Sequence, residues 1–266
     1  MYHYLQLLTK RPRKVFFNEF TVEVPVAALS AKKITAFRNF YKIDDTAPLP
    51  LSFAFIAGFK AMMKALAHKQ FAFAPLGMIH LAAEFKALAD IDYQRPFLVE
   101  VKVKQNRRHP MGKLVQLESR FIQDEQVCII NTNTMLKKLK ASNTKTLAKG
   151  LQCFVEPTSM HVDEKLARAY AKISYDYNPI HISNHLAKLF GLPGTIMHGM
   201  YFAHLLLHNN KIDSQRVKFE FKKPCLLPTD IGFANNDGQY QIFSGCDDLH
   251  LTMRVFDEIK SKDIAA

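Results

Sequence analysis

The stretch YAKISYDYNPIH, residues 170–181, places a carboxylate and an imidazole five residues apart. Between Asp176 and His181 stands the pair Asn178-Pro179, which is a turn signal, because proline fixes its own φ and disfavours helical geometry in the residue before it. A stiff bend can aim two side chains at one point, which a regular helix or strand does not do at this spacing. The stretch therefore predicts that Asp176 and His181 converge and could share a water molecule.

Composition places this stretch in an ordinary globular protein. The chain has 266 residues, of which 48% are hydrophobic and 23% charged, so it can form one large domain or two small ones. The most apolar segment, residues 50–69, is interrupted by Lys60 and Lys64 and predicts a core helix rather than a membrane span. The basic cluster near the N-terminus follows a short apolar stretch and has no small-residue cleavage site, which does not fit a secretory signal.

Cysteine usage points to a reducing compartment. The four cysteines form no C-x-x-C pair, which argues against a zinc site and against a disulfide framework: Cys128, Cys153, Cys225 and Cys246. We therefore expect a cytoplasmic protein. His204 and His208 have a metal-compatible spacing on an apolar helix, but the segment HLLLH lacks the Glu and third ligand of a zinc enzyme, so core or rim histidines are expected.

The excess of positive over negative charge is confined to the first part of the chain. Residues 1–150 hold 24 Lys and Arg against 11 Asp and Glu, whereas residues 151–266 hold 12 against 13. Such an asymmetry can attract phosphates, an acidic protein or an anionic membrane, or it can simply serve solubility. Nucleic acid is not expected as a partner, because the sequence has no basic recognition helix, zinc-finger spacing or aromatic RNA-reading motif.

Hydrophobic patterns divide the chain into two similar lobes. Residues 137–150 are rich in Lys, Ser and Thr and lack periodicity, which predicts a linker. Before this segment, an apolar helix over about residues 52–68 precedes several strand-like runs. After it, the helices SNHLAKLFG and GMYFAHLLLHN again precede strands. This order indicates an α+β architecture in which one buried helix packs against a curved sheet, twice.

A family resemblance rests on two motifs of the second lobe. The string from Tyr170 to Ala187, followed by IMHGM at 196–200, resembles the signature of the MaoC-like acyl dehydratases, also called hydratase 2 or (R)-specific enoyl-CoA hydratases. This family has the hotdog fold, and the phrase VKFEFKKPCLLPTD resembles the strand and turn that close its lobe. The first lobe lacks the Asp-x-Asn-Pro-x-His string. The resemblance implies a double hotdog, with a degenerate N-terminal repeat over 1–136 that shapes the substrate tunnel, a linker over 137–150 and a catalytic repeat over 151–266.

The resemblance also implies roles for individual residues. Asp176 and His181 match the pair that holds the catalytic water, and Gly199 matches the glycine whose amide binds the thioester oxygen. Gly199 begins an apolar helix, where free N–H groups and the helix dipole favour negative charge. An alternative for Gly199 is close packing at the helix start.

Four neighbouring residues are expected to support the site. These residues are also candidates for substrate binding. Asn178 braces the loop, with a second role in polarising the Asp-His pair, His198 hydrogen-bonds the loop or packs at the helix start, and Ser174 caps the loop, since no nucleophile elbow surrounds it. Tyr175 stands where the family usually has glycine, and we interpret this departure as altered substrate selection. His80, outside these motifs, is expected to be a strand residue facing a groove.

The expected function is a hydro-lyase reaction, the hydration of 2-enoyl thioesters or the dehydration of 3-hydroxyacyl thioesters, with no cofactor and no metal. Coenzyme A or an acyl carrier protein would carry the acyl group, and Arg107, Arg108 and Lys113 near one turn could meet phosphates or an acidic carrier. A homodimer is plausible, and no stable membrane insertion is expected. Two alternatives remain, a hotdog thioesterase and a non-catalytic acyl-thioester binding protein.

Overall fold

The computed structural model describes residues 17–138, 159–236, 238–245 and 248–256. The first lobe runs in the order β1 (Phe20–Val26), α2 (Ala31–Tyr41), α3 (Phe53–Ala67), β2 (Ile79–Ala87), β3 (Phe97–His109), β4 (Gly112–Gln123) and β5 (Gln126–Lys138). The second lobe runs in the order β6 (Met160–Val162), α4 (Glu164–Ser174), α5 (Pro179–Ile182), α6 (Asn184–Leu189), α7 (Gly199–Asn209), β7 (Arg216–Phe221), β8 (Thr229–Asn236), β9 (Gln239–Ser244) and β10 (Asp248–Val255). Each lobe begins with a strand, β1 or β6, that the sequence did not predict, and after this strand the helices precede the remaining strands as predicted.

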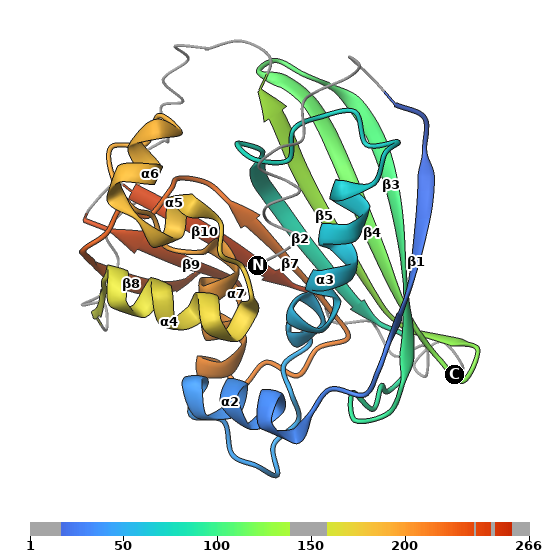
Figure 1. Cartoon of the computed structure of the whole chain (residues 1–266). Helices are drawn as coiled ribbons and strands as arrows, with labels where there is room; N and C mark the ends of the chain where they lie inside the picture. Colours follow the sequence, from blue (N-terminus) through green and yellow to red (C-terminus); the bar gives the residue numbers. More distant parts are fainter. Residues whose placement is uncertain (1–16, 139–158, 237, 246–247, 257–266) are drawn as a thin grey trace, which may run out of the picture.

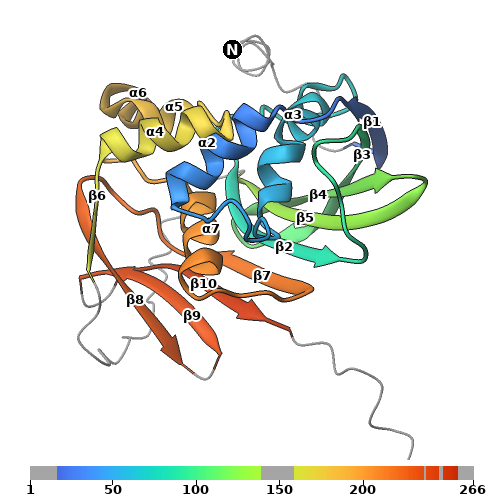
Figure 2. The ribbon, with the colours of Figure 1, turned by 90° about the horizontal axis from the view of Figure 1, so that it is seen from below.

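The strands form one ten-stranded antiparallel sheet with the order β1-β3-β4-β5-β2-β7-β10-β9-β8-β6. The order is symmetric about the β2–β7 pair, since each strand of one lobe has a counterpart at the mirrored position of the other. Figure 1 shows the curved sheet of each lobe beside its long helix, α3 in the first lobe and α7 in the second. Seen from below, in Figure 2, α2 lies beside α4, in agreement with their contacts. This is the double hotdog arrangement that the sequence predicted.

The two central helices are apolar on nearly every side, because each is enclosed by its sheet and by neighbouring helices. Eleven residues of α3 and eight of α7 are buried. Gly58 lets α3 approach the sheet, because a Cβ on this residue would lie 2.6 Å from the Phe121 ring of β4. The predicted core helix over residues 52–68 is therefore confirmed. No helix in the described ranges is long and apolar enough to cross a membrane.

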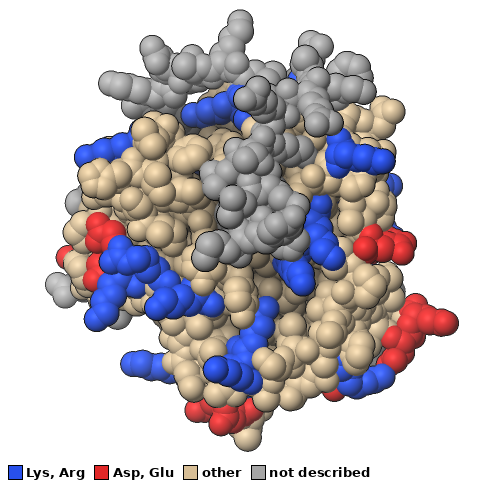
Figure 3. Space-filling view, in the orientation of Figure 1, with Lys and Arg blue, Asp and Glu red and all other residues tan. Residues whose placement is uncertain are grey.

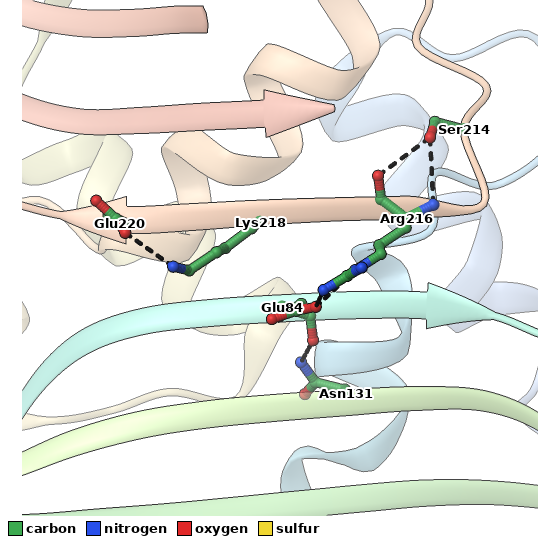
Figure 4. Close-up of polar contacts among 6 residues, drawn as sticks. All are labelled: Glu84, Asn131, Ser214, Arg216, Lys218 and Glu220. Carbon is green, nitrogen blue, oxygen red and sulfur yellow. Dashed lines mark hydrogen bonds and ion pairs between the residues drawn. The ribbon is translucent and has the colours of Figure 1, made fainter. Parts of the chain in front are cut away.

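The β2–β7 pair is the seam between the lobes. On its inner face Phe85 and Phe219 are fully buried, and their ring centroids lie 6.1 Å apart. On its outer face Glu84 of β2 accepts two bonds from the Arg216 guanidinium, at 2.8 Å and 2.7 Å (Figure 4). This alternation fixes the register, because a one-residue slip would turn the buried rings outward.

The predicted linker is only partly described. Lys137 and Lys138, assigned to the linker from their composition, are the last residues of β5, where they pair with Lys113 and Gly112 of β4. Pairing along the neighbouring strand therefore outweighs their polar character. Residues 139–150 lie outside the described residues.

Candidate active site

The loop between α4 and α5 is shaped by its own side chains. Helix α4 ends at Tyr175, whose backbone is left-handed with φ 61°. The Ser174 hydroxyl donates to the Tyr170 carbonyl and accepts from the Asp176 N–H, at 3.0 Å and 3.2 Å. The Asp176 carboxylate in turn accepts from the Asn178 N–H at 3.1 Å, which is an Asx turn. The loop therefore holds Asp176 where the chain reverses into α5.

Helix α5 is short, and its start places His181 near this carboxylate. Pro179 occupies the first helical position, where its missing N–H costs nothing, and the His181 N–H bonds to the Asn178 carbonyl at 2.9 Å. The carboxylate of Asp176 and the ring nitrogens of His181 and His198 offer one atom each, and these three atoms all lie within 4.8 Å of one another. The predicted convergence of Asp176 and His181 is thus present in the structure.

A backbone carbonyl decides the tautomer of His181. Its Nδ1 lies 2.8 Å from the Ile196 carbonyl oxygen, which can only accept, so Nδ1 carries the proton. Burial lowers the pKa of the His181 imidazole, and the Asp176 carboxylate opposes this effect. A neutral ring protonated on Nδ1 leaves the lone pair on Nε2. This nitrogen is therefore able to take a proton from water.

His198 holds the loop and the His181 ring in place. Its Nε2 donates to the backbone carbonyl of Asp176 at 3.0 Å, and its ring stacks on His181 with centroids 3.8 Å apart. Burial and the nearby His181 lower the pKa of His198 to about 3, so it stays neutral. A neutral stacked ring restricts the rotamer of His181 without adding a competing charge.

The segment that carries Ile196 and His198 is anchored by further hydrogen bonds. The Ile196 N–H donates to the Ile180 carbonyl at 3.1 Å, and the Thr195 N–H bonds to the Asn184 side-chain oxygen at 2.9 Å. The sequence analysis did not identify these contacts, because they use backbone groups that every residue type offers. Asn184 is a side-chain signal for this anchor, but it stands in a segment whose pattern is that of a short helix.

Gly199 is the first residue of α7, and close packing requires its small size. A Cβ at this position would lie 2.6 Å from the Phe221 ring. The His198 side chain gives no capping hydrogen bond to the helix start. The N-terminal amides of α7 therefore present partial positive charge beside the Asp176 loop. Both expectations for Gly199, close packing and an oxyanion site, are compatible with this position.

The remaining predicted residues have distinct positions. Ser174 caps the loop as expected, and Asn178 supplies a backbone carbonyl but no side-chain capping bond. Tyr175 is 49% exposed, and the Lys33 ammonium lies 4.7 Å from the centre of its ring. Desolvation lowers the pKa of this lysine to about 8. Tyr175 therefore shapes the backbone at the end of α4, and its ring lies on the exposed side of the loop, against Lys33.

In the part of the chain that the structure describes, His204 and His208 belong to no group that could hold a metal ion. His204 is fully buried, and its Nδ1 lies 2.6 Å from the Ser52 hydroxyl at the start of α3, which makes it a core contact between the two central helices. Within the described ranges, Asp176, His181 and His198 are the one group whose atoms could surround an ion. One nitrogen of the His181 ring and one nitrogen of the His198 ring are already bonded to backbone carbonyls.

Fold and site together define a double-hotdog protein with one Asp-His loop, in its second lobe. The family model of the MaoC like domain matches residues 137–231, which include the whole loop and the start of α7. The chain is 27% identical over 240 residues to the 3-hydroxyacyl-thioester dehydratase X of Mycobacterium tuberculosis, covering 87% of this chain and 86% of that protein. A segment of 32 residues is 59% identical to part of the fatty acid synthase subunit beta of Saccharomyces cerevisiae, and covers 2% of that protein.

Solved structures of dehydratases are also similar to this chain over most of its length. The crystal structure of HtdX from Mycobacterium tuberculosis superimposes with a TM-score of 0.75 and 26% identity, over 89% of this chain and all of that one. A MaoC-like dehydratase aligns with a TM-score of 0.66 at 15% identity, over 92% and 99% of the two chains, and a further one from Phytophthora capsici with 0.61 at 13%, over 93% and 98%. At these lower identities the likeness concerns the fold alone. The second lobe thus matches the MaoC like domain, and the whole chain is similar to a 3-hydroxyacyl-thioester dehydratase.

Proposed function

We propose that this protein is a hydro-lyase that adds water to 2-enoyl thioesters and removes it from 3-hydroxyacyl thioesters. The observation that carries the proposal is the neutral His181, protonated on Nδ1 by its bond to the Ile196 carbonyl and placed beside the Asp176 carboxylate. The homology to a 3-hydroxyacyl-thioester dehydratase supports the same reaction class.

In the hydration direction, His181 Nε2 accepts a proton from the water whose oxygen bonds to C3 of the substrate. The Asp176 carboxylate orients this water and stabilises the imidazolium, in keeping with its opposing effect on the His181 pKa. Electrons of the double bond move onto the thioester oxygen, where the N-terminal amide of α7 at Gly199 stabilises the enolate. The proton then passes to C2, so that one water is consumed and the imidazole returns to its neutral form.

His198, Ser174 and Asn178 serve this reaction as positioning residues. His198 and Ser174 hold the backbone of Asp176 from both sides, through its carbonyl and its N–H. Asn178 starts the helix that carries His181. We expect their substitution to lower turnover through misalignment of the pair.

The carrier of the acyl group is proposed to be coenzyme A or an acyl carrier protein. Lys and Arg side chains occur over both lobes on the face shown in Figure 3, with fewer acidic groups among them. Several basic groups are already engaged in ion pairs, including Lys104 with Glu118 and Lys223 with Asp248. The side chains of Arg107 and Arg108 lie outside the described residues. The charge surplus of the first 150 residues supports an anionic carrier without placing its docking site.

Assembly and compartment remain proposals as well. The two lobes already supply both halves of a double hotdog, so a homodimer of the whole chain is proposed as a higher assembly. The cytoplasm is the proposed compartment, and the free, buried thiols of Cys128 and Cys225 support it.

The test follows the absorbance of an enoyl thioester together with release of free thiol, using crotonyl-CoA and a longer 2-enoyl-CoA. Loss of enoyl absorbance without thiol release, abolished in Asp176→Asn and His181→Ala, is the expected result. Thiol release would instead establish a thioesterase. Binding without turnover by the wild type would establish a non-catalytic thioester-binding protein.

A further inference from the structure

Large apolar side chains are exposed in the segment that carries the Asp-His loop. Eight large apolar side chains of the described residues are exposed, and five of them lie within residues 175–190: Tyr175, Tyr177, Leu186, Leu189 and Phe190. These five residues form a surface that we call the α6 lip. Its Leu189 is 80% exposed. Two of its tyrosines flank Asp176, which is half-buried, so the lip begins at the carboxylate of the site.

Helix α6 presents its part of the lip from an anchored backbone. The Asn184 side-chain oxygen accepts from the Thr195 N–H at 2.9 Å and from the Thr195 hydroxyl at 3.4 Å. Ala187 is fully buried, which fixes the rotation of the helix about its axis. Leu186 and Phe190 stand four residues apart, a spacing at which side chains are neighbours on a helix. The exposed apolar side chains therefore belong to a formed surface.

A basic stripe lies beside the lip, on helix α4. Lys165, Arg168 and Lys172 recur at helical spacing, and all three are exposed. Helix α4 contacts α5, which contacts α6, and Figures 1 and 2 both show the three helices side by side. In Figure 3 basic side chains gather on the left of the face, at the place of α4 in Figure 1. The apolar lip and the basic stripe are thus adjacent.

The positive charge around the lip is not balanced within its own segment. The sequence contains no Asp or Glu between Tyr177 and Ile212. Lys188 is exposed on α6 among the apolar side chains, and the Lys33 ammonium of the first lobe lies 4.7 Å from the centre of the Tyr175 ring. A contiguous apolar surface on a soluble protein marks an interaction site, and its charged margin selects the sign of the partner. The partner that fits is apolar and acidic.

The molecule that holds the substrate thioester has to approach this surface, because the lip adjoins the half-buried Asp176. Coenzyme A presents phosphates and a nucleotide, and phosphates are bound by Lys, Arg and backbone N–H groups, so it offers no partner for exposed leucines. A carrier protein presents a surface of side chains, and protein interfaces bury an apolar centre within a polar rim. The composition of the lip therefore favours a protein carrier.

Two other occupants match the surface less well. A second copy of this chain has the same net charge of +12, and a two-fold contact at α6 would bring the basic residues of both copies together. A membrane over the lip would cover the side on which Asp176 is accessible and would exclude the hydrophilic group that carries the thioester. An acidic protein satisfies both the charge and the approach.

We propose that the α6 lip and the basic stripe of α4 are the docking site of an acidic acyl carrier protein. The carrier's phosphopantetheine arm then delivers the acyl thioester to Asp176 and His181. This inference rests on the proposed function of that site. It assigns the protein-bound thioester as the preferred substrate class, and coenzyme A as a smaller substitute that leaves the lip uncovered.

The test measures hydration of one crotonyl group on two carriers, coenzyme A and a purified acidic acyl carrier protein. The wild-type kcat/KM should be at least about 10-fold higher with the carrier protein, because docking adds binding energy remote from the reacting atoms. Leu189→Glu should lower the carrier-to-CoA ratio of kcat/KM by about 30-fold, the effect of losing an interface hot spot. Leu189→Lys removes the same apolar side chain, but its loss should be about 10-fold smaller, since its charge attracts an acidic partner. An unchanged ratio in Leu189→Glu, or an equal loss in both variants, would overturn the proposal.

Matched controls separate docking from general effects of exposure and charge. Leu88→Glu places the same charge on another exposed leucine, which follows β2 at the end opposite to the one that meets Phe221, and should leave the ratio unchanged. Arg168→Glu should lower the ratio by about 10-fold, whereas Arg254→Glu, which makes the same change in net charge at an exposed position of β10, should not. Equal effects of the two arginine variants would refute a local role for the stripe.

Two physical measurements decide between the possible occupants. Cosedimentation of the wild type with anionic phosphatidylglycerol vesicles, abolished by Leu189→Glu while the carrier-to-CoA ratio is unchanged, would assign the lip to a membrane. A dimer in sedimentation velocity that Leu189→Glu dissociates, again with an unchanged ratio, would assign it to a second copy. Either result overturns the docking of a carrier.

Failure of this inference is distinguishable from failure of the proposed function. If crotonyl-CoA is hydrated and the carrier protein gives no higher kcat/KM, the function stands and the docking proposal falls. If the wild type binds the crotonyl carrier without turnover, the function fails, and a Kd measured with a fluorescently labelled carrier still decides the docking through its change in Leu189→Glu. A wild type that neither binds nor hydrates either thioester overturns both.

Discussion

Replacing Gly199 by alanine tests the packing and the chemistry of the helix start at once. The new Cβ would lie 2.6 Å and 2.7 Å from two carbons of the Phe221 ring. Ordinary contact begins near 3.4 Å, so the ring or the helix must move by about 0.8 Å. Overpacking of this kind costs about 2 kcal/mol, which for a protein of this size lowers Tm by about 4–8 °C. Because the displaced amide is a proposed oxyanion donor, kcat should fall by about 10²-fold.

A double-mutant cycle separates the two effects. Phe221→Leu shortens the side chain that meets the new methyl group, so the double variant should regain much of the Tm lost in Gly199→Ala. Its kcat should remain low if the amide acts on the substrate. Tm is measured by thermal unfolding, and kcat by the loss of enoyl absorbance. A wild-type Tm for Gly199→Ala would refute the steric argument, and a wild-type kcat would refute the oxyanion role.

Three further predictions concern the histidines and the Tyr175 turn. His198→Phe keeps a ring against His181 but loses the bond to the Asp176 carbonyl, so kcat should fall by about 10-fold or more with the fold intact, and an unchanged kcat would contradict the positioning role. Because the folded pKa of His80, His198 and His204 is depressed to about 4, 3 and 3, the unfolded state binds more protons than the folded state as the pH falls through 6.5. Stability should therefore fall by roughly 1.4 kcal/mol per histidine between pH 7.5 and pH 5.5, and His204→Phe should remove one proton from the titration measured by urea unfolding at several pH values. Tyr175→Gly relieves the strain of a left-handed backbone, about 1–2 kcal/mol, and loses a cation–π contact with Lys33 of about 0.5–1 kcal/mol, so Tm should rise slightly. Tyr175→Ala keeps the backbone strain and loses the same contact, so its Tm should fall.

The sequence predicted the second lobe well because its signals are local. A turn dipeptide, a helix start and an apolar segment are all readable from neighbouring residues, and they located Asp176, His181 and Gly199. The α+β class and the repeat followed from the order of helices and strands. These signals needed no knowledge of which strands pair.

The unpredicted features depend on long-range register. The His80 ring lies against Phe55 and Phe221 because of a bulge in β2, and no residue type in that strand announces it. The tautomer of His181 depends on the Ile196 carbonyl, 15 residues further along the chain. Lys137 and Lys138 continue a strand despite their polar composition, because the neighbouring strand offers them partners. The sequence could not show that Tyr175 ends α4 with a left-handed backbone and an exposed side chain. The role of this residue in substrate selection stays a prediction.

The pairing of β2 with β7 has a consequence for how such a chain can change over evolutionary time. Separating the lobes would expose two sheet edges with unpaired backbone groups, which are prone to pair with other chains. Neither lobe can therefore be discarded, even though only one carries the Asp-His loop. The lobe without the loop is free to vary wherever it does not touch the seam, whereas the residues of β2 are held in place by their pairing with β7.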